Sequence, residues 1–373
     1  MISLKIMYKL LILSAFISFL SCSNNPDESV TILKDDRQVP IKPENFYFPP
    51  NDSSEWETVS FSELGWNETA AENLKIFLTE KNTESFIVLK DGKIALEYYF
   101  NEGNVNKNHS WNSAAKTLVA FTVGIAQQQN YLNIDDKTSK YLGEGWTSMT
   151  TEQENRITIK NQLSMTSGGN YTNVNLNCKE PDCLKYNANA GTEWYYYNAY
   201  YQLLKDVTTA AVPTDFDDFF AAELKEKIGM DGFWLDYQDN NIFLSTARSM
   251  ARFGLLNLNK GNWDGNQILN EAYFNEMTNT SQNLNEAYGY LWWLNGKDSY
   301  KLPLTTTVFQ GKLITNAPND LIAGLGKFDQ KLYVVPSKGL VIVRMGDGAA
   351  NIVPGPSGFD NELWEKINEM ILD

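Results

Sequence analysis

Histidine is almost absent from this sequence of 373 residues and cysteine is rare, with one histidine and three cysteines in the chain. The histidine, His109, lies only four residues before Ser113, an awkward position for an imidazole base that a third group must orient. The sequence contains neither a Gly-x-Ser-x-Gly nucleophile elbow nor a His-Glu-x-x-His zinc motif. We therefore expect no Ser-His-Asp triad, no metal and no cofactor, and we expect His109 to be a surface or helix-cap residue. Acid–base chemistry would then depend on lysine, tyrosine, aspartate or glutamate.

Positively charged residues are also few compared with negatively charged ones. The chain has 31 lysines and arginines against 46 aspartates and glutamates, which gives a net charge of -15. A nucleic acid or an anionic membrane surface would require a basic patch, so neither is expected as the main partner. With 43% hydrophobic and 21% charged residues, the chain is expected to be globular and to bury a large core.

The apolar run at the start of the chain is too short to span a bilayer. It extends from Leu10 to Leu20 after Lys5 and Lys9, whereas a transmembrane helix needs roughly 20 apolar residues. This pattern predicts an export signal at residues 1–21. Because a small residue precedes Cys22, the site resembles a bacterial lipoprotein cleavage site, which predicts that Cys22 is lipidated. The alternative is an ordinary secretory signal in which Cys22 has no role.

The stretch after the signal is rich in proline, asparagine and serine and shows no lasting hydrophobic period. It predicts a flexible tether at residues 22–54, followed by one folded domain at residues 55–373. The predicted location is the bacterial cell envelope, where the lipid anchor would hold the protein at a periplasmic or outer-membrane face.

Two further cysteines, Cys178 and Cys183, flank the turn-like spacer KEPD. In an oxidising compartment, so close a pair favours a disulfide that staples a loop. The alternative is two free thiols, since two cysteines and one distant histidine are too few for zinc.

Hydrophobic patterns predict hairpins near both ends of the domain. Residues 85–100 form two β-rich runs about Asp91-Gly92, and residues 331–346 form a second pair. Helical periodicity precedes the first pair at residues 70–81 and follows the second at residues 361–372. The middle, about 117–280, is predicted to be mostly helical or loop-like. The predicted fold class is α/β, with an antiparallel sheet from both chain ends, flanking helices and an inserted, mostly helical lobe.

The segment HSWNSAAKTLVAFTVG, residues 109–124, places Ser113 and Lys116 at the mouth of an apolar helical run. Residues three apart share a helix face, so the hydroxyl and amine can approach each other. The helix N-terminus also supplies backbone N–H groups that favour an oxyanion. The pattern therefore predicts a nucleophile and its base, whereas the alternative is a serine that only caps the helix.

Further along the chain, six segments follow in an order that resembles a known family. They are LNIDDKTSKYL (132–142), ITIKNQLSMTSGG (157–169), GTEWYYYNAYYQLL (191–204), STARSMARFGLLNLNKGNWDGNQIL (245–269), YGYLWWL (288–294) and LYVVPSKGLVIVRMG (332–346). Together with Ser-x-x-Lys, they resemble the serine β-lactamase and penicillin-binding-protein superfamily, in particular its class C branch with D-alanyl-D-alanine peptidases, esterases and 6-aminohexanoate-dimer hydrolases. The resemblance implies a β-lactamase/transpeptidase-like fold from about residue 55.

The resemblance also implies roles for individual residues. Ser113 would be the nucleophile and Lys116 its partner, while the family's Tyr-x-Asn motif would place Tyr196 as the acid–base phenol and Asn198 as a substrate-binding amide. Burial would lower the pKa of the lysine, and a neighbouring ammonium would lower that of the phenol. The alternative is an aromatic core cluster in which Asn198 caps a helix.

The third family motif, Lys-Thr-Gly, has no lysine here. Gly324-Leu325-Gly326 stands at its place, so the resemblance implies substrate contact by Gly324 and Gly326 and a second oxyanion donor in a backbone N–H near Lys327. No cation at the motif position can pair with the carboxylate of a penicillin or a D-alanine terminus. The departure therefore favours less acidic esters or amides.

From these observations we predict an exported serine hydrolase that forms an acyl-enzyme on Ser113 and cleaves a small ester, amide or peptide substrate. The alternative is a lipid-anchored, non-catalytic protein that binds a glycan or peptide, since 13% of the residues are aromatic. Trp292 and Trp293 are expected either in an apolar acyl pocket or in the core.

Overall fold

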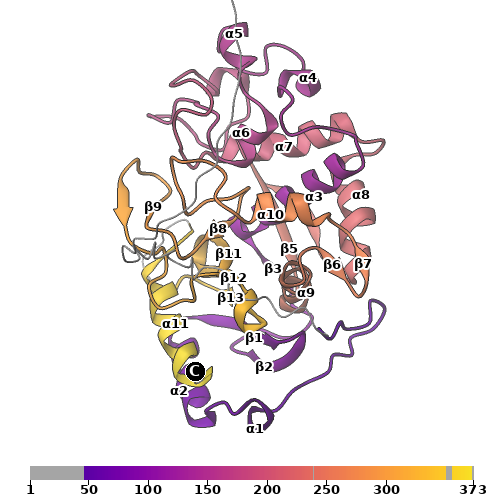
Figure 1. Ribbon diagram of the computed structural model, residues 1–373, viewed down its shortest axis with the longest axis vertical. Helices are drawn as coiled ribbons and strands as arrows, with labels where there is room; N and C mark the ends of the chain where they lie inside the picture. Colours follow the sequence, from indigo (N-terminus) through magenta and orange to yellow (C-terminus); the bar gives the residue numbers. More distant parts are fainter. Residues whose placement is uncertain (1–45, 238, 350–354, 372–373) are drawn as a thin grey trace, which may run out of the picture. The chain divides into compact units, whose positions relative to one another are not determined.

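The computed structural model describes residues 46–237, 239–349 and 355–371, and Figure 1 shows the elements that they form. The chain divides into two units, Met1–Val39 and Pro40–Asp373, and every described element belongs to the second. The predicted export signal, Cys22 and the first part of the predicted tether lie outside the described residues. None of the described helices is long and apolar enough to cross a membrane.

The largest described sheet has six antiparallel strands in the order β2-β1-β13-β12-β11-β8. The strands are β1 (Thr83–Lys90), β2 (Lys93–Tyr99), β8 (Trp293–Leu294), β11 (Ile322–Gly326), β12 (Gln330–Val335) and β13 (Leu340–Gly346). Asp91 and Gly92 turn the first hairpin with left-handed backbones, φ 50° and 88°, as a two-residue turn of this kind requires. Val88 lies opposite Ile342, so the two ends of the domain share one sheet. Strand β1 pairs with β2 and strand β12 pairs with β13, which confirms both predicted hairpins.

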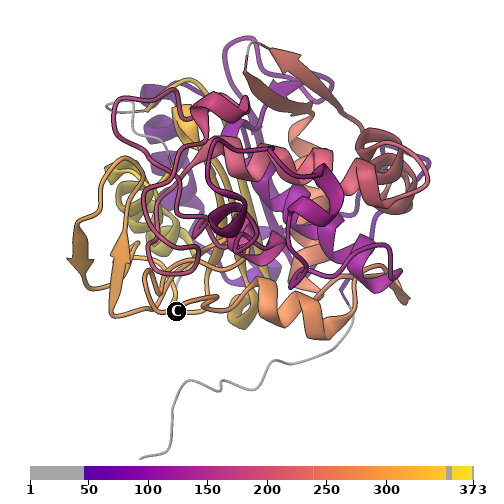
Figure 2. The same cartoon turned by 90° about the horizontal axis from the view of Figure 1, so that it is seen from above.

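Helices cover both faces of this sheet. On β12, Leu332 points toward α9 (Ala247–Leu258), where Gly254 brings the helix close, and its neighbour Tyr333 points the other way and packs on Trp364 of α11 (Gly358–Ile371). Helix α2 (Glu68–Glu80) packs beside α11. Both views show the indigo N-terminal and yellow C-terminal elements side by side (Figure 1, Figure 2). The two flanking helices predicted from the sequence are confirmed.

The remaining helices lie in the middle of the chain, except for the first, which precedes α2. They are α1 (Phe61–Leu64), α3 (Lys116–Gln128), α4 (Ser139–Leu142), α5 (Thr151–Glu154), α6 (Ile159–Leu163), α7 (Asn198–Ala211), α8 (Phe216–Phe220) and α10 (Glu271–Met277). Short turns of other helical types lie at Asn112–Ala115 (η1), Pro181–Cys183 (η2), Ala221–Lys225 (η3), Glu226–Ile228 (η4), Lys327–Asp329 (η5) and Pro336–Lys338 (η6). Helix α3 is buried on all sides from Lys116 to Ala126, and it packs against α7 and α10.

The sequence pattern did not predict several short strands within and beside the middle of the chain. A three-stranded sheet has the order β3-β5-β4, formed by β3 (His109–Ser110), β4 (Phe233–Tyr237) and β5 (Asn240–Ser245). Two-stranded ribbons pair β6 (Asn262–Trp263) with β7 (Asn266–Gln267), and β9 (Ser299–Lys301) with β10 (Val308–Gln310). Strand β4 exposes Phe233, Leu235 and Tyr237, so it lacks the apolar-in, polar-out alternation of a strand with a buried face.

The end of the predicted tether packs against the domain. Arg252 of α9 donates hydrogen bonds to the carbonyls of Pro49 and Pro50, and Phe48 lies edge-on to Trp263. The folded part of the chain therefore begins before the predicted domain start at residue 55. In the helical region, Cys178 and Cys183 form a disulfide across η2.

Candidate active site

Ser113 lies on η1, the short 3-10 turn that leads directly into α3. The turn is anchored by the fully buried Trp111, whose backbone N–H donates to Phe243 O (2.9 Å) and whose indole donates to Ser245 Oγ (2.7 Å). Asn112 follows with a left-handed backbone, φ 48°, and Ser113 comes next, half-buried. The unpredicted small sheet thus supports the turn that carries Ser113, because both anchoring partners of Trp111 belong to β5.

The predicted pair of Ser113 and Lys116 is in contact. Lys116 Nζ lies 2.9 Å from Ser113 Oγ, within hydrogen-bond distance. The interpretation of Ser113 as a helix cap is wrong, because the N-cap position of α3 is Ala115 and no side chain caps this helix. The hydroxyl is therefore available for chemistry with the amine.

Burial lowers the pKa of Lys116 well below its ordinary value of 10.5. Its side chain is 2% exposed, and within the described residues no carboxylate forms an ion pair with it. Two aromatic rings favour the charged form, since Nζ lies 4.0 Å from the ring centre of Tyr201 and 4.8 Å from that of Tyr196. Such contacts contribute about 0.5–2 kcal/mol each, less than the several kcal/mol that burial of an unpaired ammonium costs. The net direction is downward, and a neutral amine can accept the proton of Ser113.

Tyr196 completes the group around the hydroxyl. Its side chain is almost fully buried, and its phenol interacts with the side chain of Ser113. Burial raises the pKa of Tyr196, and the interaction with Ser113 offsets this only in part. The expectation that a neighbouring ammonium lowers this pKa is therefore wrong, because the neighbouring amine is itself desolvated. Tyr196 is a neutral hydroxyl that can donate a proton.

Tyr201 is a site residue that the sequence did not identify. It belongs to a run of five tyrosines at 195–197 and 200–201, of which only Tyr196 fits the Tyr-x-Asn motif. Its ring is nevertheless the closer of the two to Lys116 Nζ, and it lies on α7, which packs against α3. The one available signal was its place five residues after Tyr196.

The tryptophans near the site belong to the core. Trp292 is fully buried and Trp293 is 2% exposed. Trp293 stacks on Tyr196, with ring centres 6.0 Å apart and an interplanar angle of 18°. The core interpretation of these residues is therefore correct, and Trp293 supports the phenol.

Asn198 begins α7 and points toward the disulfide loop. Its Nδ2 donates to Asn177 Oδ1 at 2.8 Å, and the N–H of Ala199 donates to Leu176 O at the same distance. Its own Oδ1 is buried and has no hydrogen-bond partner among the described residues. The helix cap interpretation does not hold, because the N-cap residue of α7 is Tyr197. A substrate-binding role for the Asn198 amide stays a prediction, with one unused acceptor to support it.

The glycines of the third motif lie on β11, directly against the turn that carries Ser113. A Cβ on Gly326 would lie 2.4 Å from Trp111 O, which no real contact allows, and a Cβ on Gly324 would lie 3.3 Å from Thr117 Cγ2. The close backbone approach expected here therefore exists, but it is made to the protein's own η1 and α3. Lys327 follows β11, and its carbonyl accepts a hydrogen bond from Asn112 Nδ2 at 2.8 Å. Its role as an oxyanion donor stays a prediction.

His109 has a structural place on β3. It lies opposite Ser245 of β5, and its Nδ1 is 3.1 Å from Ser110 O. Within the part of the chain that the structure describes, no group of three or more histidine, cysteine, aspartate or glutamate side chains could hold a metal ion.

Known proteins resemble this chain over most of its length. A family model described as Beta-lactamase matches residues 83–362. An uncharacterized protein of Alkalihalophilus pseudofirmus is 24% identical over 313 residues, which cover 74% of this chain and 85% of that protein.

Solved structures share the fold at low sequence identity. A protein assigned as a 6-aminohexanoate-dimer hydrolase from Bacillus anthracis is 18% identical, with a TM-score of 0.65 over 87% of this chain and 88% of its own. A penicillin-binding protein homologue from Caulobacter crescentus is 11% identical (TM-score 0.62; 84% and 99%), and a family VIII carboxylesterase is 14% identical (0.60; 82% and 96%). The predicted α/β, β-lactamase/transpeptidase-like fold is confirmed.

Proposed function

The chain belongs to the β-lactamase family, and we propose that it is an exported serine hydrolase that forms an acyl-enzyme on Ser113 and cleaves ester or amide bonds of small substrates. The family resemblance inferred from the sequence is thereby confirmed. The observation that carries the proposal is the 2.9 Å contact between Ser113 Oγ and a fully buried Lys116 amine.

Acylation would begin with a proton transfer from Ser113 to Lys116. A neutral amine at hydrogen-bond distance is a competent general base, and the freed alkoxide would attack the substrate carbonyl. Backbone N–H groups of η1 and of Lys327 would stabilise the oxyanion that forms, which requires the close packing of β11 on η1.

Collapse of the tetrahedral intermediate needs a proton on the leaving group. Tyr196 can donate it, since its phenol is neutral and interacts with Ser113, and Lys116 then passes the proton that it took from Ser113 to the phenolate oxygen of Tyr196. Water would then attack the carbonyl of the acyl-enzyme, and Ser113 would leave, with the proton transfers in the opposite direction. All the groups required are side chains or backbone N–H groups of this chain.

The absence of a lysine at the third motif supports a substrate without a carboxylate. Gly324 is buried against Thr117 and Ala114, so at this position the strand has backbone groups but no charged side chain that could bind a substrate carboxylate. We propose that neutral esters or amides are preferred over penicillin-like lactams.

The test is labelling by a fluorophosphonate probe together with turnover of p-nitrophenyl esters, a peptide panel and nitrocefin. We expect stoichiometric labelling of wild type at Ser113, no labelling of Ser113→Ala, and faster turnover of a neutral ester than of nitrocefin. Thermal unfolding should confirm that Ser113→Ala is folded. A wild-type protein that neither labels nor turns over any member of the panel would favour the alternative, a non-catalytic ligand-binding protein.

Export and lipidation form a separate proposal, supported by Lys5, Lys9, the apolar run 10–20 and Cys22. In a bacterial expression host, Cys22→Ser should move the protein from the membrane fraction to the soluble envelope fraction. Unchanged fractionation of this variant would count against a lipid anchor.

A further inference from the structure

The turn between β11 and β12 holds two neighbouring residues in a strained backbone conformation. Phe328 and Asp329 have φ angles of 61° and 57°, in the left-handed region that glycine favours, and neither is a glycine. A non-glycine residue in this region is strained and persists only where surrounding contacts hold it.

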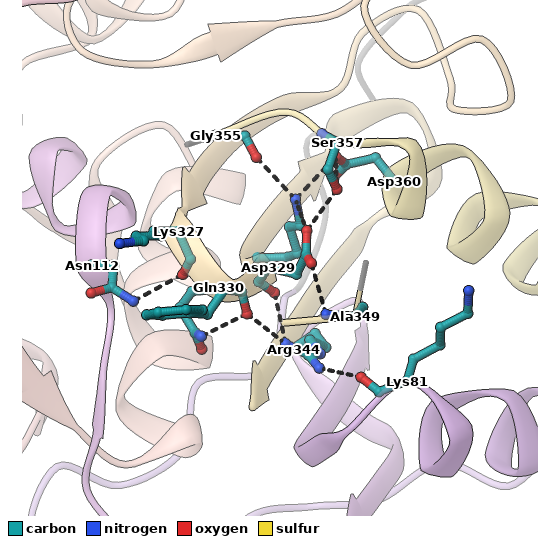
Figure 3. A network of polar contacts seen from close by, with 12 residues as sticks. Lys81, Asn112, Lys327, Asp329, Gln330, Arg344, Ala349, Gly355, Ser357 and Asp360 are labelled. Carbon is teal, nitrogen blue, oxygen red and sulfur yellow. Dashed lines mark hydrogen bonds and ion pairs between the residues drawn. The ribbon is translucent and has the colours of Figure 1, made fainter. Parts of the chain in front are cut away.

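Arg344 of β13 supplies those contacts (Figure 3). Its side chain is fully buried, and Nη1 donates to Phe328 O (2.9 Å) and to Asp329 O (3.2 Å). The remaining donors of the guanidinium bind Lys81 O (2.7 Å), Asp347 O (2.8 Å) and Thr83 Oγ1 (3.2 Å). Burial lowers the pKa of Arg344 to about 10, so it is still a cation at neutral pH. All five N–H groups of an arginine are thus used to hold backbone and one hydroxyl in place.

The side chain of Asp329 is held as firmly as its carbonyl. Its carboxylate accepts hydrogen bonds from Ser357 Oγ (2.6 Å) and the Ala349 N–H (3.0 Å), and it lies 3.2 Å from Lys331 Nζ. Gln330 Nε2 adds a second donor to Phe328 O at 2.9 Å (Figure 3). The turn is therefore fixed on both sides of its left-handed pair.

The same turn contacts the segment that carries the nucleophile. Lys327 O accepts the bond from Asn112 Nδ2, and Asn112 is itself left-handed and precedes Ser113. Gly326 lies so close to Trp111 O that a displacement of the turn would also displace the start of η1. The hydrogen bond to the Lys327 carbonyl thus links the left-handed Asn112 to the turn that contains the left-handed Phe328 and Asp329.

We propose that Arg344 is a positioning residue for the reaction: it holds the Phe328–Asp329 turn so that Lys327 O fixes Asn112 and keeps Ser113 aimed at Lys116. The inference rests on the proposed function and deepens it. Arg344 touches neither Ser113 nor Lys116 in the contacts above, so it acts through the turn and Asn112.

The test measures the second-order rate of Ser113 labelling by a fluorophosphonate, as a function of pH, in four variants. Arg344→Lys removes the planar five-donor group, and Asn112→Gly removes the amide but permits the left-handed backbone. Arg252→Lys is the control for a buried arginine, since Arg252 is 5% exposed and donates to the carbonyls of Pro49, Pro50, Ser53 and Ile228 instead. Asn130→Gly is the control for a left-handed asparagine, φ 62°.

We expect Arg344→Lys and Asn112→Gly to lower the plateau of the pH–rate curve by about 10- to 100-fold, because small misplacements of a reacting group cost this much. Both controls should stay within about twofold of wild type, even if Arg252→Lys loses as much thermal stability as Arg344→Lys. A purely structural Arg344 would lower the unfolding temperature and leave the plateau in place.

The outcomes separate the inference from the proposed function. If wild type labels at Ser113 and both Arg344→Lys and Asn112→Gly label as fast as their controls, the inference is overturned and the proposed function stands. If wild type does not label, both fall together. Should Arg344→Lys fail to fold, Asn112→Gly alone decides, since it leaves the arginine and its contacts intact.

Discussion

Lys116 and Lys205 are both buried lysines that lie over a pair of aromatic rings, but their polar partners differ. Lys116 Nζ has Ser113 Oγ at 2.9 Å beside the rings of Tyr201 and Tyr196. Lys205 Nζ lies 4.5 Å and 5.1 Å from the ring centres of Trp234 and Phe216, and 2.8 Å from Asp217 Oδ1.

Burial under aromatic rings therefore does not by itself make a lysine a base. The Asp217 carboxylate compensates the charge of an ammonium at Lys205, so that side chain can serve as a structural ion pair. Lys116 has a hydroxyl in the same place, and a hydroxyl cannot compensate a full charge. The missing carboxylate is therefore the feature that suits Lys116 to take a proton.

Removing each lysine in turn gives the largest expected contrast. Lys116→Met should lower turnover of a p-nitrophenyl ester by about 10³-fold, because it removes the general base. Lys205→Met should stay within about twofold of wild type. Steady-state rates of variants shown to be folded check this, and a comparable loss in both variants would mean that the two lysines do not differ in role.

The dependence of folding stability on pH should also distinguish Lys116 from Lys205. The folded-state pKa of Lys116 is lowered, so above that value the unfolded chain binds one proton more than the folded chain. Stability should therefore rise with pH between the lowered pKa and the unfolded-state value of about 10.4, by at most about 1.4 kcal/mol per pH unit. Urea unfolding across this range measures the slope.

Lys116→Met should abolish this rise in stability, whereas Lys205→Met should retain it. If the slope is the same in wild type and in Lys116→Met, then Lys116 is not neutral in the folded state.

The ring of Tyr201 should have the smallest effect. Tyr201→Leu removes a ring that favours the ammonium of Lys116, so the acidic limb of the pH–rate curve should move to lower pH by about half a unit, equivalent to about 0.7 kcal/mol. Tyr201→Phe keeps the ring and should leave the limb nearly in place. A shift of equal size in both variants would assign the effect to the hydroxyl instead.

Local patterns were sufficient to predict the frame of the fold and the first contact of the site. The turn at Asp91-Gly92 and the apolar alternation around it predict a hairpin without any knowledge of distant residues. Ser113 and Lys116 could be paired for the same reason, since residues three apart on one helical segment must meet.

The features that the sequence did not reveal depend on contacts between distant residues. Strand β4 bears exposed aromatic residues and pairs with β5, so no periodic burial marked it. The closeness of Tyr201 to Lys116 follows from the packing of α7 on α3. The pKa of Tyr196 is raised because the phenol is almost completely buried, and the spacing of residues along the sequence does not reveal this burial.

The sheet that joins both ends of the domain also determines when the surroundings of Ser113 are complete. Strand β1 cannot complete its pairing before β13 has been made, because Thr83 lies opposite Gly346. The turn of Ser113 likewise cannot complete its packing before β11, Ile322–Gly326, has been made. Such long-range pairings form late in folding, because a large loop has to close first. A growing chain that already contains Ser113 and Lys116 therefore still lacks the strand that completes their surroundings. We therefore expect Ser113 to stay unreactive until nearly the whole chain has been made.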